Sequence, residues 1–155
     1  MGIKILDTYP EKVYNLIMVK EIIYRITKNI TSRINYQFIF CSRYRRAIFE
    51  IEGVEKRFCE IVNDICKELD IKLYKVECKV DYVYISLEAP PKLSSNDIER
   101  KIKSKSSPIL ISEFKELSKI PNIWTRNYLV TTDEILDKME VEKFLEKQKR
   151  DRSKG

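Results

Sequence analysis

The fold is decided by one stretch of the chain, Lys79-Val80-Asp81-Tyr82-Val83-Tyr84-Ile85-Ser86-Leu87-Glu88-Ala89-Pro90-Pro91. Its side chains alternate in character, which is typical of a β-strand with one buried face. Val83, Ile85 and Leu87 lie on one face, and the two tyrosines lie with Ser86 on the other. The Pro-Pro pair ends the strand because proline has no N–H to donate to a neighbouring strand. We therefore predict a strand over residues 82–89.

The composition is that of a soluble globular protein. The chain has 155 residues, of which 43% are hydrophobic and 35% are charged, enough for one domain with a sizeable core. A net charge of +6 permits a polyanionic partner but is weak evidence for one.

The chain has four cysteines and no histidine, which favours reduced core thiols over a metal site. Asp7, Pro10 and Glu11 interrupt any signal peptide, and no apolar run is long enough for a membrane span. We expect a cytoplasmic protein without membrane contact.

Periodicity predicts the other elements around this strand. A helical stripe over residues 11–28 predicts an N-terminal helix, and the alternation of Arg33 to Cys41 predicts the first strand of the domain. Ser94-Ser95-Asn96-Asp97 is a good helix start because its short polar side chains can cap free amides. The remaining elements are a helix over 54–69, a strand over 71–80, a helix from the cap towards Lys103, a helix over 107–119, a strand after Trp124 and a final helix.

This order of elements fits an α+β fold, a ferredoxin-like antiparallel sheet with helices packed on one face. We divide the chain into an N-terminal helical extension over residues 1–30, a ferredoxin-like domain over residues 31–150 and a charged tail over residues 151–155.

The Asp81-Tyr82-Val83-Tyr84 motif and its prolines resemble the Asp-His-hydrophobic-His strand of the IS200/IS605-type tyrosine transposases. The resemblance covers residues 33 to 150. In that family the two histidines hold a divalent metal, Mg²⁺ or Mn²⁺, and here Tyr82 and Tyr84 replace them. The family also has a Gly-Gly hinge and a nucleophilic tyrosine. Counted from Trp124, these positions fall on Glu134-Ile135 and on Phe144.

These replacements remove the chemistry that the resemblance would otherwise imply. Phe144 has no oxygen to attack a phosphate. A phenol with a pKa near 10 is a poor metal ligand at neutral pH. Asp81 and Gln148 match remaining ligand-like positions, but two oxygen donors are too few to hold Mg²⁺ without substrate. The resemblance therefore implies a relative without catalytic residues, metal or other cofactor.

Two basic segments are candidates for nucleic-acid contact. Ser42-Arg43-Tyr44-Arg45-Arg46 resembles the Lys-Tyr-Arg-Arg that follows the first strand in the family, and guanidinium groups around an aromatic ring suit phosphates and bases. Lys103-Ser104-Lys105-Ser106-Ser107 stands where the family has Lys-Gly-Arg-Ser-Ser, and such groups beside a helix N-terminus suit an anion. A solvated loop and a plain helix junction are the respective alternatives. The candidate nucleic-acid-binding residues are Arg43, Tyr44, Arg45, Arg46, Lys103, Lys105, Ser106 and Arg126.

Two interpretations remain for Tyr82 and Tyr84. They could stack unpaired bases where the metal lies in the family. They could also pack under the final helix against Phe144, and we favour this because three positions changed together towards aromatic residues.

Three functions follow from the resemblance. The first is a catalytically inactive homologue that binds DNA hairpins or single-stranded DNA as a homodimer. The second is a protein-interaction or regulatory subunit that acts on an active transposase. The third is an active transposase or nuclease with relocated catalytic residues.

Overall fold

The computed structural model describes residues 24–153, with side chains as far as Gln148, and the chain divides into two units, Met1–Ile34 and Asn35–Gly155. The described part of the first unit is a hairpin of strands β1 (Arg25–Ile26) and β2 (Thr31–Ser32).

The prediction of a helix over residues 11–28 is wrong for residues 24–28, and its earlier part lies outside the described residues. The N–H of Thr27 donates to the carbonyl of Ile30 at 2.8 Å and closes a tight turn. The β-branched residues on either side of this turn favour strands.

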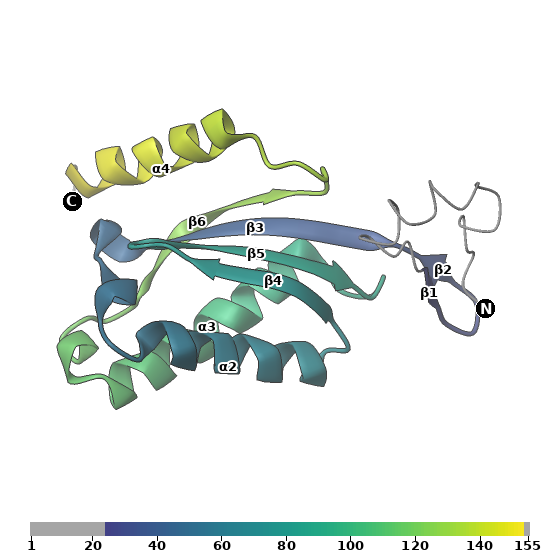
Figure 1. Ribbon diagram of the computed structural model, residues 1–155, viewed down its shortest axis with the longest axis horizontal. Helices are drawn as coiled ribbons and strands as arrows, with labels where there is room; N and C mark the ends of the chain where they lie inside the picture. Colours follow the sequence, from purple (N-terminus) through teal and green to yellow (C-terminus); the bar gives the residue numbers. More distant parts are fainter. Residues whose placement is uncertain (1–23, 154–155) are drawn as a thin grey trace, which may run out of the picture. The chain divides into compact units, whose positions relative to one another are not determined.

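The second unit contains a four-stranded sheet in the order β4-β5-β3-β6 (Figure 1). Strand β3 pairs with β6 in the antiparallel direction, and β4 pairs with β5 in the same way. Helix α2 connects β3 to β4 and α3 connects β5 to β6, so the predicted ferredoxin-like α+β fold is confirmed. The bounds are β3 Ile34–Ser42, α2 Val54–Glu68, β4 Lys72–Cys78, β5 Tyr82–Ala89, α3 Ser95–Glu113, β6 Trp124–Thr131 and α4 Lys138–Ser153.

The helices lie on both faces of the sheet. Helices α2 and α3 cover one face, as predicted, and α4 crosses the opposite face (Figure 1). Alternation along β5 explains the division, since Val83, Ile85 and Leu87 pack towards α2 and α3, whereas Tyr82 and Tyr84 pack towards α4. Helix α4 continues to Ser153 by its backbone, three residues into the expected charged tail.

Helix α3 is continuous, whereas the sequence analysis predicts two helices with a junction at residues 103–107. Ser94 caps the helix as predicted, and its hydroxyl accepts a hydrogen bond from the N–H of Asp97 at 3.0 Å. Pro108 lies inside the helix and removes one backbone hydrogen bond. The helix tolerates this loss because Pro108 is exposed. One buried stripe, with residues four apart, runs through the expected junction and holds the helix together, namely Ile98, Ile102, Ser106 and Leu110.

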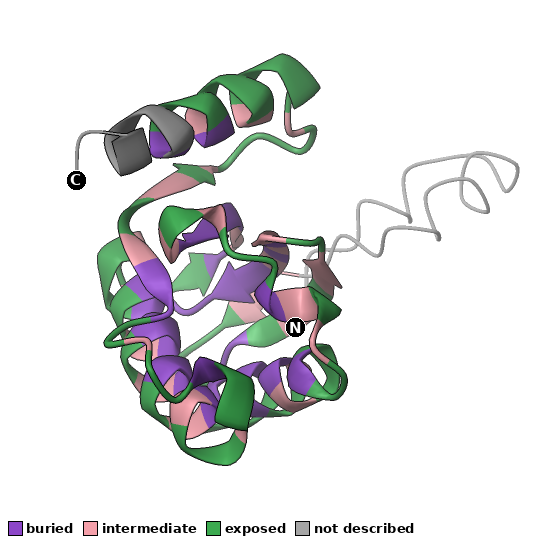
Figure 2. Cartoon of the chain, turned by 90° about the vertical axis from the view of Figure 1, so that its left-hand side faces the viewer, coloured by how far each residue is buried: buried purple, intermediate pink, exposed green. Residues whose placement is uncertain are grey.

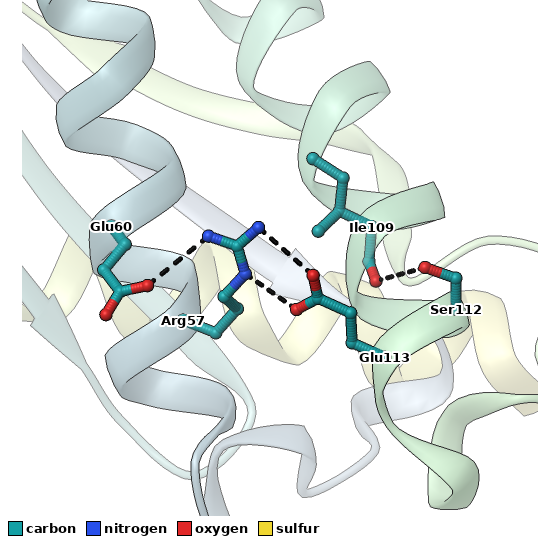
Figure 3. A network of polar contacts seen from close by, with 5 residues as sticks. All are labelled: Arg57, Glu60, Ile109, Ser112 and Glu113. Atoms are coloured by element: carbon teal, nitrogen blue, oxygen red, sulfur yellow. Dashed lines mark hydrogen bonds and ion pairs between the residues drawn. The ribbon is translucent and has the colours of Figure 1, made fainter.

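Helices α2 and α3 are also linked at their exposed surface (Figure 3). Arg57 on α2 makes two hydrogen bonds to the carboxylate of Glu113 on α3, at 2.7 and 3.2 Å. Ion pairs this exposed contribute little to stability. The helices are therefore held mainly by their apolar faces, which are buried against the sheet (Figure 2). Among residues 24–153, none of the helices has the length and hydrophobicity needed to cross a bilayer.

Candidate functional site

A tight turn at residues 42–46 presents an aromatic ring at the end of β3. The hydroxyl of Ser42 donates to the carbonyl of Arg46 at 2.7 Å and closes the turn. The N–H of Arg43 donates to the carbonyl of Ile123 at 2.6 Å, which fixes the turn against the start of β6. Tyr44 has a φ of 60°, a conformation that is uncommon for residues other than glycine and is often found at functional sites.

Tyr44, Arg43 and Arg46 form one group at the surface, in which Arg43 is partly buried and the other two residues are exposed. The tyrosine side chain is 40% exposed, and the guanidinium carbons of Arg43 and Arg46 lie 5.7 and 5.5 Å from its ring centroid. Neither guanidinium forms an ion pair with a residue in the described part of the chain. A flat ring between two unpaired cations suits a nucleobase with its phosphates. The structure thus brings three of the predicted residues together.

Arg45, in the same turn, has a different environment. Its Nε donates to Asp81 Oδ2 at 2.6 Å, and one of its terminal nitrogens donates to the carbonyl of Leu145 on α4 at 3.0 Å. Both charged side chains of this ion pair are only 14% exposed. Arg45 therefore tethers α4 to the sheet and is separated from the nucleic-acid candidates beside it.

The second basic segment lies inside α3. Lys103 is 9% exposed and binds Glu99 at 2.9 Å and the carbonyls of Thr125 and Asn127 at 2.8 and 3.1 Å. Desolvation by burial lowers the pKa of Lys103.

The other candidates of this segment are engaged as well. Ser106 accepts a hydrogen bond from the indole of Trp124 at 2.9 Å, and Lys105 pairs with Glu68. No helix begins at residues 103–107, so the anion site expected at a helix N-terminus there is wrong. Arg126 is exposed at the start of β6.

Three aromatic residues lie in one apolar cluster between the sheet and α4. Tyr82, Tyr84 and Phe144 are half-buried and pack against Ile39, Cys41 and Leu145. This arrangement fits the interpretation that the tyrosines pack under the final helix.

A chain of hydrogen bonds leads from this cluster to the segment before α4. The hydroxyl of Tyr84 donates to Gln37 Oε1 at 2.6 Å, and the side-chain amide of Gln37 donates to the carbonyl of Asp133. Residues 134–135, which the resemblance assigns to the hinge position of the family, follow directly. The residue just before the hinge position is thus bonded to β3.

The donors present do not fit a divalent cation. Asp81 is already neutralised by Arg45, and a cation beside it would be repelled by the guanidinium. Gln148 is 5% exposed and faces the apolar cluster side of α4. The described residues contain no group of three or more acidic or cysteine side chains that could hold a metal.

Sequence reasoning missed Gln37 and the tether made by Arg45. The sequence does contain a signal for Gln37, because it is a polar residue on the same face of β3 as the apolar residues Ile39 and Cys41. The sequence contains no such signal for Arg45, because the direction of its side chain depends on positive φ angles at Tyr44 and Arg45.

The fold and these positions define the class: a ferredoxin-like domain that carries a basic aromatic turn at one end of its sheet and a separate final helix over the second face. The family model described as "Transposase IS200 like" matches residues 30–148. The chain therefore belongs to the IS200-like transposase family.

Individual relatives agree with this assignment. The transposases for insertion sequence element IS200 of Salmonella typhimurium and Salmonella typhi are each 33% identical over 101 residues, which is 63% of this chain. The match spans 65% of the length of each relative. The ISDra2 transposase TnpA of Deinococcus radiodurans is 23% identical over 119 residues, covering 75% of this chain and 84% of the relative.

Solved structures show the same fold. A transposase structure from Deinococcus radiodurans R1 superposes with a TM-score of 0.73 at 23% identity, covering 80% of this chain and 97% of that one. A REP-associated tyrosine transposase bound to a REP hairpin superposes with a TM-score of 0.50 at 10% identity, covering 77% and 67%.

Proposed function

We propose that this protein binds DNA hairpins and adjoining single-stranded DNA without cleaving them. The observation that carries the proposal is the exposed Tyr44 ring between the guanidinium groups of Arg43 and Arg46. Cations neutralise phosphates and the ring can stack on an unpaired base. The hairpin ligand of the REP-associated neighbour supports the choice of a hairpin as the probe.

The proposal of no cleavage rests on the opposite face of the sheet. Phe144 offers no nucleophile, and the described neighbours of Tyr82 and Tyr84 in this cluster are apolar side chains that can neither accept a proton from a phenol nor hold a metal. The Asp81 carboxylate is already paired with Arg45, so we propose a protein without a metal cofactor. Incubation of an end-labelled hairpin with Mg²⁺ or Mn²⁺ should give no nicked product. Nicking that a point change in this chain abolishes would contradict the proposal.

A gel shift with a DNA hairpin tests the binding surface. The double variant Arg43→Ala/Arg46→Ala should lose about tenfold in affinity, and the slope of log affinity against log salt should decrease by about one for each lost phosphate contact. The matched control is Lys56→Ala/Lys67→Ala, which removes the same charge from the exposed face of α2. An equal loss in both double variants would show that overall charge, and not the turn, determines binding.

We further propose a homodimer. Strands β4 and β6 are the two edges of the sheet, and an edge strand can pair with another chain. Glu134 and Ile135 lack the φ freedom of the family's glycine hinge, which supports a single placement of α4 on its own sheet. Light scattering at micromolar concentration should give twice the chain mass of 18.5 kDa. A monomeric mass would contradict this assignment.

A mixed dimer with an active transposase is the second candidate. Its support is the combination of an exposed basic turn with a tethered helix that carries Phe144 in place of the nucleophile. Such a subunit would occupy DNA and contribute no attacking group. Added to an active family member, the protein should lower the nicking rate, and the Arg43→Ala/Arg46→Ala variant should lower it less.

A further inference from the structure

Two of the four cysteines approach each other where α2 packs on the edge strand β4. Cys78 is the last residue of β4 and lies opposite Val83 in the register with β5. Partners in an antiparallel pair project to the same face of a sheet, and Val83 is buried in the core under α2 and α3. Cys78 therefore projects towards α2, where it packs against the same core.

Cys59 lies on α2 at the margin of the buried stripe of that helix. It directly follows Phe58 and stands three residues before Val62, and both of these side chains are fully buried. The thiols of Cys59 and Cys78 are free and partly buried, and a hydrogen bond joins the two side chains. Because both residues keep some exposure, a small solute can reach the two sulfur atoms.

The backbone after Cys78 holds the end of β4 in place. The carbonyl of Val80 accepts a hydrogen bond from the N–H of Phe49 at 3.3 Å. The carbonyl of Asp81 accepts one from the N–H of Ser42 at 2.8 Å. Since these bonds fix the connection between β4 and β5, the sulfur of Cys78 stays opposite α2 in the folded protein.

The hydrogen bond between the thiols gives them different chemistry. It lowers the pKa of Cys59 and raises the pKa of Cys78, so the S–H of Cys78 donates and Cys59 carries the negative charge. The thiolate is the nucleophilic form of cysteine. Cys59 is therefore the attacking sulfur of the pair. By contrast, burial raises the pKa of Cys66, on the same helix, to about 11.

We propose that Cys59 and Cys78 form a reversible disulfide when the protein meets hydrogen peroxide. The Cys59 thiolate attacks one peroxide oxygen, the O–O bond breaks, and hydroxide leaves a sulfenic acid on Cys59. The Cys78 sulfur then attacks the Cys59 sulfur, and the sulfenic hydroxyl leaves as water with the proton of Cys78. In total, two thiols and one hydrogen peroxide give one disulfide and two water molecules. A reducing thiol such as glutathione restores both cysteines by exchange.

The disulfide joins α2 covalently to the edge of the sheet. It closes a loop that holds the end of α2 and the rest of β4, and such a loop restricts the unfolded chain. Oxidation should therefore stabilise the domain. This inference is independent of the proposed DNA binding, because none of the residues that carry it belongs to the basic turn.

The test exposes the reduced natural protein to an equimolar amount of hydrogen peroxide at pH 8 and then blocks free thiols with iodoacetamide. Digestion without reductant should give one linked peptide pair that contains Cys59 and Cys78, and dithiothreitol should separate it. Cys59 should be oxidised about tenfold faster than Cys66, because its larger thiolate fraction outweighs its lower nucleophilicity. The melting temperature of the oxidised protein should exceed that of the reduced protein.

Two serine variants assign the reaction to this pair. Cys78→Ser keeps the attacking sulfur and removes its partner, so peroxide should leave a sulfenic acid on Cys59 that dimedone labels, with no linked peptide and no rise in melting temperature. The matched control Cys66→Ser changes another cysteine of α2 and should still form the disulfide.

The natural protein alone can overturn the proposal, so a variant that fails to fold does not remove the test. Two thiols that both remain free after peroxide treatment would overturn it. So would a sulfenic acid on Cys59 that persists beside a free Cys78. A linked peptide that contains Cys41 or Cys66, or one that joins two chains, would overturn it as well.

Discussion

The two faces of the sheet are covered in different ways. Among the side chains that the structure describes, the face under α2 and α3 belongs to a cluster of twenty buried residues, whereas the cluster under α4 has three, Ile39, Cys41 and Leu145. Burial of apolar area is the main source of stability, so the first face carries most of it. On the second face, polar contacts add to the attachment: Arg45 binds the carbonyl of Leu145, and Tyr84 reaches Asp133 through Gln37.

The difference supports the proposal of a relative without catalytic chemistry, because it shows how one face could change without loss of the fold. The positions that the resemblance assigns to the family's metal ligands and nucleophile all lie on the face under α4. Tyr82, Tyr84 and Phe144 contribute apolar area beneath α4, in a cluster that is separate from the larger core. A relative can thus change its chemistry on one face while the other keeps the domain folded.

The largest expected effect is a loss of folding stability, and it tests the difference between the two faces directly. Phe58→Ala, in the core under α2, should lower the free energy of unfolding by about 3–5 kcal/mol, and Leu145→Ala on α4 by about 2 kcal/mol. Urea denaturation gives both values. Hydrogen exchange should rise throughout the domain in the first variant and mainly in α4 in the second. Equal losses, or an even spread of exchange in both, would remove the distinction between the faces.

The second prediction introduces histidines at positions 82 and 84, on the face of the sheet under α4. Tyr82→His/Tyr84→His replaces two half-buried rings with smaller polar ones and should cost about 2–3 kcal/mol. The control Tyr84→Phe removes only the hydroxyl bonded to Gln37 and should cost about 1 kcal/mol. Neither variant should cleave DNA, because Phe144 supplies no oxygen. Adding Phe144→Tyr gives every reactive group and should give at best weak nicking.

The same double variant tests the alternative role of the two tyrosines. If its melting temperature matches that of the parent while its affinity for single-stranded DNA falls, the rings form a base-stacking platform. A lower melting temperature with unchanged affinity supports an aromatic core.

Much of the fold could be predicted because it follows from local patterns. Alternation and the Pro-Pro stop give β5 its exact bounds at Tyr82 and Ala89, and the Ser94 capping box gives the start of α3. The continuity of α3 could not be predicted in this way. It depends on tertiary burial of the stripe that passes Ser106, which outweighs the loss at Pro108.

The site was less predictable because it depends on non-periodic backbone. Arg45 and Arg46 are neighbours with the same chemistry, yet one tethers α4 and the other flanks Tyr44. Positive φ angles at Tyr44 and Arg45 direct them to different sides. No spacing rule covers such a turn. The sequence therefore predicts that residues 42–46 form a basic cluster, but not which contact each arginine makes.

The third prediction uses this pair of neighbours. Arg45→Met keeps most of the side-chain stem and leaves Asp81 unpaired, so it should lower stability by about 2 kcal/mol and leave hairpin affinity almost unchanged. Arg46→Met should lower hairpin affinity and leave the unfolding midpoint almost unchanged. Denaturation and gel shift on both variants measure the two effects. A shared loss of stability, or a shared loss of affinity, would show that the turn acts as one unit.

The smallest expected effect is a difference in cysteine reactivity, measured on the natural chain. Its thiols report separately on the two faces of the sheet. Burial raises the pKa of Cys41, under α4, to about 12, and that of Cys66, under α2, to about 11. At pH 8 both thiols therefore stay protonated in the folded state and react only after opening. A hydrogen bond from Cys78 lowers the pKa of Cys59, so more of it is thiolate and it should be alkylated first. Cys41 should follow through local release of α4, and Cys66 should be last because it requires unfolding of the larger core.

Mass spectrometry after timed iodoacetamide treatment gives the order of alkylation, and Arg45→Met should accelerate the alkylation of Cys41 more than that of Cys66. If Cys66 reacts as fast as Cys41, α4 does not open separately and the two faces unfold together.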